Sequence, residues 1–260
     1  MLARRGLAFQ CTTTSVSRAI ALRESIRLRQ HFFDDPVRQP LRKGPRIADL
    51  TGLKLWSSAK PMLHHMESDV LPALRGALAS PRPLRVLELG SGCGFLGIGL
   101  AALGETVVLT DPAIPVNFEH EEEDGARSSL DWLQSNIDLN RELVGERAVA
   151  RQLAWGDPQH EAAIRREWSG EDGFDLIVGS DLLYNPDEYE GLLHTLRAFC
   201  AADRHPPALL VYPPRHPGEQ RFFDSASHDF RLRRRTIQGR AGENGASLVE
   251  LNQMGAAETR

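Results

Sequence analysis

The chain has 260 residues, of which 41% are hydrophobic, and a formal net charge of −4 at pH 7. This apolar content suffices for one sizeable core, and the negative charge argues against a general nucleic-acid binder, whose phosphate contacts need a basic face. The three cysteines have no paired spacing, which predicts neither a disulfide framework nor a zinc site. No apolar run approaches the length of a membrane span. We therefore expect an intracellular, cytoplasmic monomer that binds no metal, membrane or nucleic acid.

Residues 1–50 are predicted to form an extension to a single domain over residues 51–260. The extension is rich in arginine and threonine, and its first thirty residues contain Glu24 as the only acid. This composition resembles an organelle-targeting segment, so mitochondrial import is the alternative to a cytoplasmic location. Residues 20–33 have a second interpretation, an amphipathic helix that covers the sheet edge or helps to hold a substrate.

The first strongly patterned unit is a strand over residues 85–89, a glycine-rich turn and a helix over residues 95–103. Gly90, Gly92 and Gly94 let the backbone turn sharply and approach a ligand closely, and the helix N-terminus then faces that ligand. A second strand over residues 106–110 ends at Asp111, about twenty residues past the glycines, where an acid can accept both hydroxyls of a ribose. The pattern predicts a nucleotide-binding unit.

Glu88 distinguishes between two kinds of nucleotide ligand. The run from Gly92 to Gly97 also satisfies the dinucleotide pattern of dehydrogenases. An acid two residues before Gly90, however, would repel a pyrophosphate and would suit a ligand with an amino group and a sulfonium, such as S-adenosylmethionine. The alternative is that Glu88 is a solvated charge at the strand end.

A further buried strand over residues 174–180 stops at Asp181. Ligands of open parallel sheets lie beyond the carboxyl ends of the strands, so Asp181 and Tyr184 should meet the substrate there, and Ser180 should line the cofactor. A carboxylate can orient an amine, and an aromatic ring can face a cation, which makes this an amine-binding pair. The alternative for Asp181 is ordinary helix capping.

The remaining pattern alternates between strands and helices, which predicts an α/β, Rossmann-like, doubly wound sheet of seven strands. The sheet should be mostly parallel, with a C-terminal antiparallel hairpin, and the arginines from Arg231 to Arg235 should lie on the wet side of a strand. The other expected elements are helices over 126–140, 159–168, 187–201 and 218–226, and strands over 148–154, 207–212, 230–237 and 248–251.

These motifs resemble those of the seven-β-strand (class I) protein lysine methyltransferases, the group that acts on elongation factors, chaperones and related ATPases. Relatives with the same core methylate histidine or arginine. The resemblance covers residues 51 to 230, and the acid-x-x-aromatic motif at Asp181 is its most specific part. The motifs that carry it are Thr51–Ala59, Val86–Gly92, Leu109–Asp111, Asn136–Asn140, Ala154–Gly156 and Asp175–Tyr184.

The resemblance implies S-adenosylmethionine as the cofactor and a lysine of a protein as the substrate. It implies that Trp56 packs near the methionine moiety and that Trp155 flanks adenine, although both tryptophans could instead fill the core. Asp181 and Tyr184 would be the catalytic pair. Alternatives are a small-molecule, histidine or arginine methyltransferase, or an idle binding protein. The other implied cofactor-binding residues are Glu88, Gly90, Ser91, Gly92, Asp111 and Ser180.

One segment departs from the family pattern. The link after Asp111 is longer than usual and contains an acidic stretch over residues 117–125. Its like charges repel one another, which predicts a solvated surface loop. The alternative is that it recruits a lysine-rich target.

Overall fold

The central element is a seven-stranded sheet with the strand order β5-β4-β3-β6-β7-β9-β8. The computed structural model describes residues 9–15, 25–31, 52–77, 81–115, 128–168, 173–201, 205–214, 218–239 and 245–254. Strands β3 to β7 pair in parallel, and β9 runs antiparallel to both β7 and β8. The predicted fold class is confirmed. The strands are β3 (Arg85–Leu89), β4 (Thr106–Asp111), β5 (Ala148–Gln152), β6 (Leu176–Ser180), β7 (Ala208–Tyr212), β8 (Phe230–Ile237) and β9 (Ala246–Gln253).

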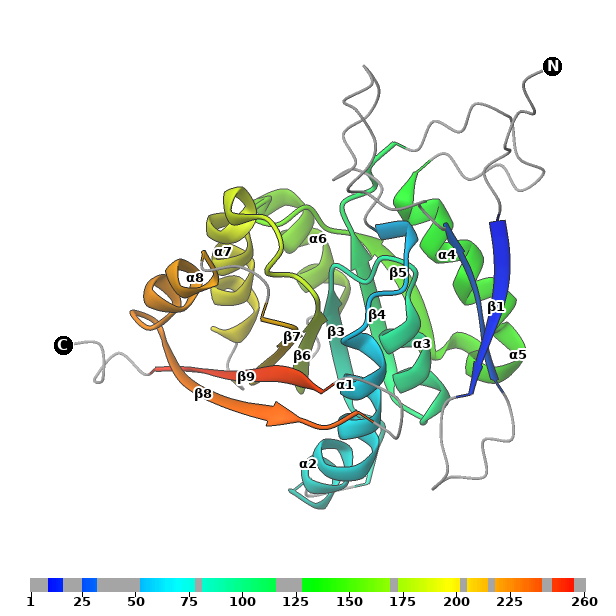
Figure 1. Ribbon diagram of the computed structural model, residues 1–260, viewed down its shortest axis with the longest axis horizontal. Helices are drawn as coiled ribbons and strands as arrows, with labels where there is room; N and C mark the ends of the chain where they lie inside the picture. The colour runs from blue at the N-terminus through cyan, green and yellow to red at the C-terminus, as the bar shows by residue number, and fades with distance from the viewer. Residues whose placement is uncertain are drawn as a thin grey trace.

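Helices cover both faces of this sheet (Figure 1). One face carries α1 (Ala59–His65), α3 (Phe95–Ala102), α4 (Ser129–Leu139) and α5 (Arg141–Val144), and the other carries α6 (Pro158–Trp168), α7 (Tyr189–Cys200) and α8 (Glu219–Ala226). A π-helical turn, Met66–Val70, joins α1 to α2 (Leu71–Ala77). Among the described residues, no helix is long and apolar enough to cross a membrane.

Two element ends differ from the sequence prediction in a way that shapes the site. Strand β5 ends at Gln152 instead of residue 154, so Leu153 and Ala154 lie beyond it and line a cavity. Helix α4 begins at Ser129 instead of residue 126, because the Ser128 side chain accepts a hydrogen bond from the Asp131 N–H and caps the helix.

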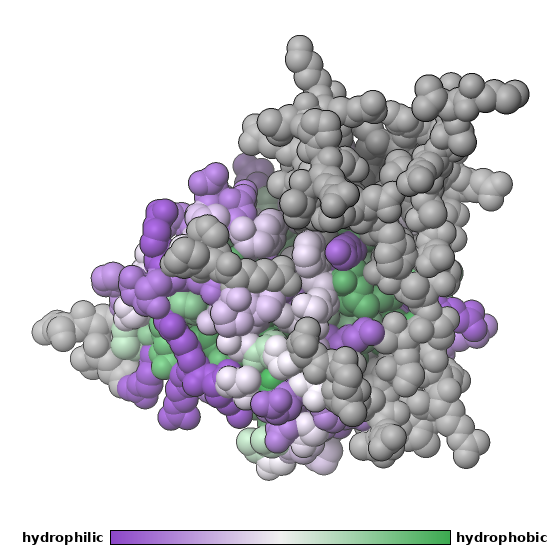
Figure 2. Space-filling view, in the orientation of Figure 1, coloured by the Kyte–Doolittle hydropathy of each residue, from purple (hydrophilic) through white to green (hydrophobic). Residues whose placement is uncertain are grey.

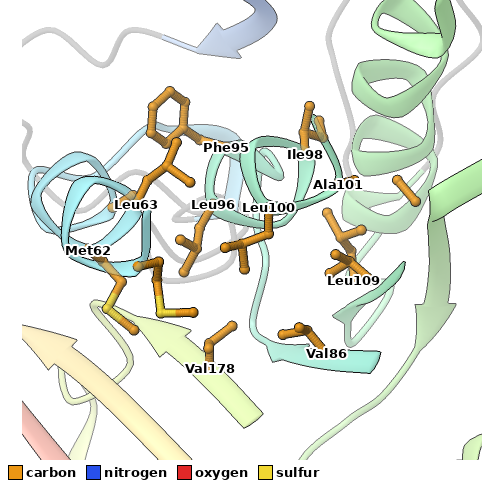
Figure 3. Close-up of a cluster of buried hydrophobic side chains, with 14 of the residues drawn as sticks. Met62, Leu63, Val86, Phe95, Leu96, Ile98, Leu100, Ala101, Leu109 and Val178 are labelled. Carbon is orange, nitrogen blue, oxygen red and sulfur yellow. The ribbon is translucent and has the colours of Figure 1, made fainter. Parts of the chain in front are cut away.

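The sheet is held by apolar clusters on its two faces. Successive strand residues point to opposite faces, so Val86 enters one cluster whereas Leu87 enters the other. Figure 3 shows the first cluster, in which Leu96 and Leu100 of α3 point toward Val86 and Val178 of the sheet. Both faces of β3 are therefore fixed, and the turn that follows Leu89 starts from a rigid position.

An antiparallel hairpin of β1 (Phe9–Ser15) and β2 (Ser25–His31) packs beside α3 and α4. The helix considered for residues 20–33 is therefore wrong over residues 25–31. Ile26 and Leu28 are buried while Arg27 is exposed, which is the period-two alternation of a strand with one buried face. Asn140 fixes the strand, because its Oδ1 accepts from the Arg27 N–H (2.9 Å) and its Nδ2 donates to the Arg27 carbonyl (2.7 Å). The division of the chain at residue 50 stays a prediction.

Strand β8 forms one edge of the described sheet, and hydrophilic side chains gather over it (Figure 2). Arg231, Arg233 and Arg235 are exposed, as predicted for a wet strand face. On the opposite face, the Arg234 guanidinium lies 3.7 Å from the ring centroid of Phe223. Charged side chains on an edge strand disfavour edge-to-edge pairing with another molecule.

We predict that Ile26→Ala lowers the free energy of unfolding by about 2–5 kcal/mol, because it removes buried apolar volume between the hairpin and α4. Arg27→Ala is the matched control on the same strand. It keeps the backbone bonds to Asn140 and should change stability by less than about 0.5 kcal/mol. Urea denaturation measures both, and equal effects would contradict the packing of β2 on the core.

Candidate functional site

A cavity of about 300 Å³ lies at the carboxyl ends of β3, β4 and β6. This is where ligands bind in open α/β sheets. All ten residues singled out from the sequence line it, and the catalytic and cofactor candidates therefore share one space. Those ten residues are Trp56, Glu88, Gly90, Ser91, Gly92, Asp111, Trp155, Ser180, Asp181 and Tyr184.

The glycine turn after β3 is shaped by close neighbours within the protein. Gly90 and Gly92 have φ values of 58° and 53°, in the left-handed region that favours glycine. A Cβ on Gly90 would lie 3.0 Å from Cζ2 of Trp155, and one on Gly92 would lie 2.9 Å from the carbonyl oxygen of Gly52. The turn thus needs glycine because chain segments pack onto it from two sides, and its bare backbone remains to line the cavity.

Ser91 contributes to the cavity through its backbone. Its N–H donates to the Thr110 carbonyl (2.7 Å), and its Oγ accepts from the Thr110 N–H (3.0 Å). The hydroxyl also bonds the Glu88 carboxyl group. Because these partners use the hydroxyl, Ser91 ties the glycine turn to the adjacent strand β4.

Glu88 is 1% exposed, so the alternative of a solvated strand-end charge is wrong. Its Oε2 accepts a hydrogen bond from the Gly97 N–H (3.0 Å) in the first turn of α3. Burial raises the pKa of Glu88 to about 8, and the nearby Asp111 carboxylate adds to the rise, whereas bonds from Ser91 and Gly97 oppose it. A positively charged ligand beside Glu88 would favour its ionised form.

Asp111 ends β4 and is 5% exposed. Its Oδ2 accepts from the Gly92 N–H (3.3 Å), and the Ser129 hydroxyl donates to Oδ1. Burial raises the pKa of Asp111 to about 6, so the group is mostly ionised at neutral pH. Ser129 was not among the residues expected from the sequence, because the unusual link before it obscures its position as the first residue of α4.

Asp181 follows β6 with a φ of 59°, a left-handed conformation that is uncommon for a residue with a side chain. Two bonds hold it there. Its N–H donates to the Val211 carbonyl (2.8 Å), and its Oδ2 accepts from the Ser58 N–H (3.1 Å) just before α1. The capping alternative is wrong, because Asn185 caps the next helical turn, Pro186–Glu188. The carboxylate is therefore fixed in the cavity wall.

Aromatic side chains form the rest of the wall. Tyr184 is 49% exposed at the rim. Trp56 and Trp155 are each half-buried and line the cavity, and Trp155 also packs against the apolar cluster on one face of the sheet. The indole Nε1 of Trp155 is buried without a hydrogen-bond partner among the described residues.

The asparagine motif over residues 136–140 acts behind the cavity. Asn136 is fully buried, and its Nδ2 donates to the Cys93 carbonyl (2.9 Å) in the glycine turn. The motif therefore holds the turn from below, while Asn140 holds the hairpin.

The acidic stretch over residues 117–125 lies outside the described residues, and the described residues contain no cluster of histidine, cysteine and acidic side chains suited to a metal.

The lining fits S-adenosylmethionine. A half-buried indole offers an aromatic wall for adenine, and Asp111 offers an acceptor for ribose hydroxyls. Buried carboxyl groups at Glu88 and Asp111 favour a ligand with a net positive charge, which the sulfonium and ammonium give it. The unpartnered Nε1 of Trp155 leaves one polar atom for a ligand to satisfy.

Comparison with known proteins agrees with these features. The chain is 30% identical to mouse protein N-lysine methyltransferase METTL21A over 148 residues, which are 56% of this chain and 55% of the relative. It is 31% identical to mouse EEF1A lysine methyltransferase 3 over 147 residues, or 56% and 50% of the two chains. The alignments thus span about half the length of these relatives.

A solved magnesium protoporphyrin IX methyltransferase from Synechocystis, with bound S-adenosylmethionine, is 16% identical, covers 77% of this chain and 86% of its own, and has a TM-score of 0.45. A likeness at that level carries no argument about function. The family model described as lysine methyltransferase, however, matches residues 45–229, which is most of the chain and includes every residue that lines the cavity. The chain belongs to the lysine methyltransferase family.

Proposed function

We propose that this protein transfers a methyl group from S-adenosylmethionine to a lysine side chain of a protein substrate. One observation supports this most strongly: Asp181 and Tyr184 share a single cavity with the donor-binding candidates, and Tyr184 lies exposed at its rim. A lysine on the surface of a folded protein can enter through such a rim while the rest of the substrate stays outside. The names of the curated relatives, which include an EEF1A lysine methyltransferase, also favour a protein substrate.

Five residues and the glycine turn would hold the donor. Trp155 would stack on adenine, Asp111 would accept the ribose hydroxyls, and the backbone from Gly90 to Gly92 would approach the donor closely. Glu88, Ser180 and Trp56 would surround the methionine end. When bound, S-adenosylmethionine supplies a methyl group that its sulfonium makes electrophilic.

Asp181 would orient the substrate amine. A lysine is mostly protonated at pH 7, so it must release a proton to water before its lone pair can form the new N–C bond. A carboxylate favours the charged amine, which makes Asp181 an orienting group and a poor base. Its two fixed hydrogen bonds support this role, because the lone pair has to point at the methyl carbon from about 3–3.5 Å. Tyr184 would shape the channel.

We further propose that the enzyme is a cytoplasmic monomer without a nucleic-acid partner.

The first test is incubation of the purified full chain with radiolabelled S-adenosylmethionine and an intact cell extract. We expect a discrete labelled protein band with methyllysine by mass spectrometry. Label on small molecules alone, or methylation of histidine or arginine alone, would contradict lysine transfer. Absence of label despite donor binding would indicate an idle binding protein.

Asp181→Asn should lower kcat by about a hundredfold or more, because the orienting charge is lost while the side-chain shape is kept. Asparagine tolerates the left-handed backbone and can still accept the Ser58 N–H, so the fold and donor affinity should survive. Asp187→Asn changes an exposed acid nearby that does not line the cavity and serves as the control. Steady-state kinetics and calorimetry of donor binding separate the effects; loss of donor binding in Asp181→Asn would contradict the assignment.

The donor-free protein should lose stability as pH rises, because folding favours protonated Glu88. The pKa of Glu88 is raised from 4.5 to about 8, so the stabilisation is fully present below the unfolded value and is lost as pH rises through the folded value. Glu88→Gln mimics the neutral form. Urea denaturation between about pH 5 and about pH 8 should therefore show a flatter profile for this variant than for the wild type, with Asp111 affecting the lower part of both profiles.

Glu190→Gln, an exposed carboxylate on α7, is the control and should follow the wild-type profile. Parallel profiles for the wild type and Glu88→Gln would contradict the proposed titration of the buried group.

A further inference from the structure

Residues 52–58 form a segment that crosses the cavity from one functional acid to the other, and we call it the crossing segment. At its start, a Cβ on Gly52 would lie 3.5 Å from Oδ2 of Asp111. At its end, the Ser58 N–H donates to Oδ2 of Asp181 (3.1 Å). Leu53 is fully buried and anchors the segment to the core. Residues between these ends therefore lie between the proposed ribose site and the proposed amine site.

Lys54 lies within this span and lines the cavity. Its Nζ is 5.0 Å from the ring centroid of Trp56, a cation–π contact, and it makes no hydrogen bond or ion pair with any described residue. Lys54 as a whole is half-buried. The ammonium thus lies at the cavity without a carboxylate partner in the part of the chain that the structure describes.

Apart from the thiol of Cys93 and the phenol of Tyr184, the other ionisable side chains in the described lining around Lys54 are all carboxylic acids. Of the described residues that line the cavity, Lys54 is the one cation, and the acids are Glu88, Asp111, Asp181 and Glu188. Such a lining attracts the sulfonium and ammonium of the donor but repels the carboxylate on the same methionine carbon. That carboxylate needs a cation, since a charged group removed from water without a partner is costly.

We propose that Lys54 binds the carboxylate of the donor's methionine moiety and so fixes which way the methionine end lies in the cavity. The inference rests on the proposed function and assigns a binding role to Lys54, which lies in the motif Thr51–Ala59 but has no role implied by the resemblance. Trp56 positions Lys54 through the cation–π contact, and Glu88 is left to the ammonium of the same moiety. The carboxylate of the methionine moiety then binds Lys54 of the crossing segment, and its ammonium binds Glu88 of β3.

The test is calorimetric binding of two ligands to the full chain, S-adenosylhomocysteine and its analogue that lacks the carboxylate. The wild type should prefer S-adenosylhomocysteine by about tenfold to a hundredfold, the range of one charge-assisted hydrogen bond. In Lys54→Met, the affinity for S-adenosylhomocysteine should fall by that factor while the affinity for the analogue stays unchanged. Lys54→Arg keeps a cation and should retain much of the preference.

Lys60→Met is the matched control, because Lys60 is a half-buried lysine on α1 that does not line the cavity. It should leave both affinities unchanged, and thermal denaturation should give similar melting temperatures for all variants. Equal losses for both ligands in Lys54→Met, or no loss, would overturn the carboxylate assignment while the proposed function stands. Failure of the wild type to bind either ligand would instead overturn both proposals.

Discussion

The site depends on two carboxyl groups that folding removes from water at adjacent strand ends. Glu88 and Asp111 are each at most 5% exposed, and neither has a cationic side chain as a hydrogen-bond partner among the described residues. They are held by backbone N–H groups and hydroxyls, which compensate only part of the desolvation, so both pKa values rise. A cationic ligand would supply the missing compensation. The fold alone therefore makes this cavity favour a positively charged ligand.

The two acids can occupy these places because the strands beneath them are rigid. Both faces of β3 and β4 are packed by apolar residues, and Thr110 exchanges hydrogen bonds with Ser91 across the two strand ends. Asn136 braces the glycine turn from behind. Close packing leaves little freedom for the turn to collapse around the acids, which keeps the cavity open.

The end of the cavity at Asp181 is built differently. Asp181 has a left-handed backbone, and it is fixed by the Val211 carbonyl and the Ser58 N–H, so strain and hydrogen bonding act together. The Ser58 contact also makes the crossing segment a structural link between the two ends. A change that moves this segment should therefore alter both ends of the cavity together, and Lys54 lies between these ends.

The sequence by itself determined the sheet and the ten candidate residues that line the cavity. Short apolar strands, glycines at a turn and acids at strand ends are local signals, and parallel strands bring their carboxyl ends to one edge. The ten candidate residues meet for that reason. Tertiary structure alone decided the contacts of these residues. Glu88 is buried and accepts a hydrogen bond from α3, and the Ser91 hydroxyl accepts one from Thr110 of β4. Ser129, Ser58 and Lys54 also join the site. These contacts connect residues many positions apart, and residues 25–31 form a strand because Ile26 and Leu28 pack against distant helices, which overrides the local signal that suggested a helix.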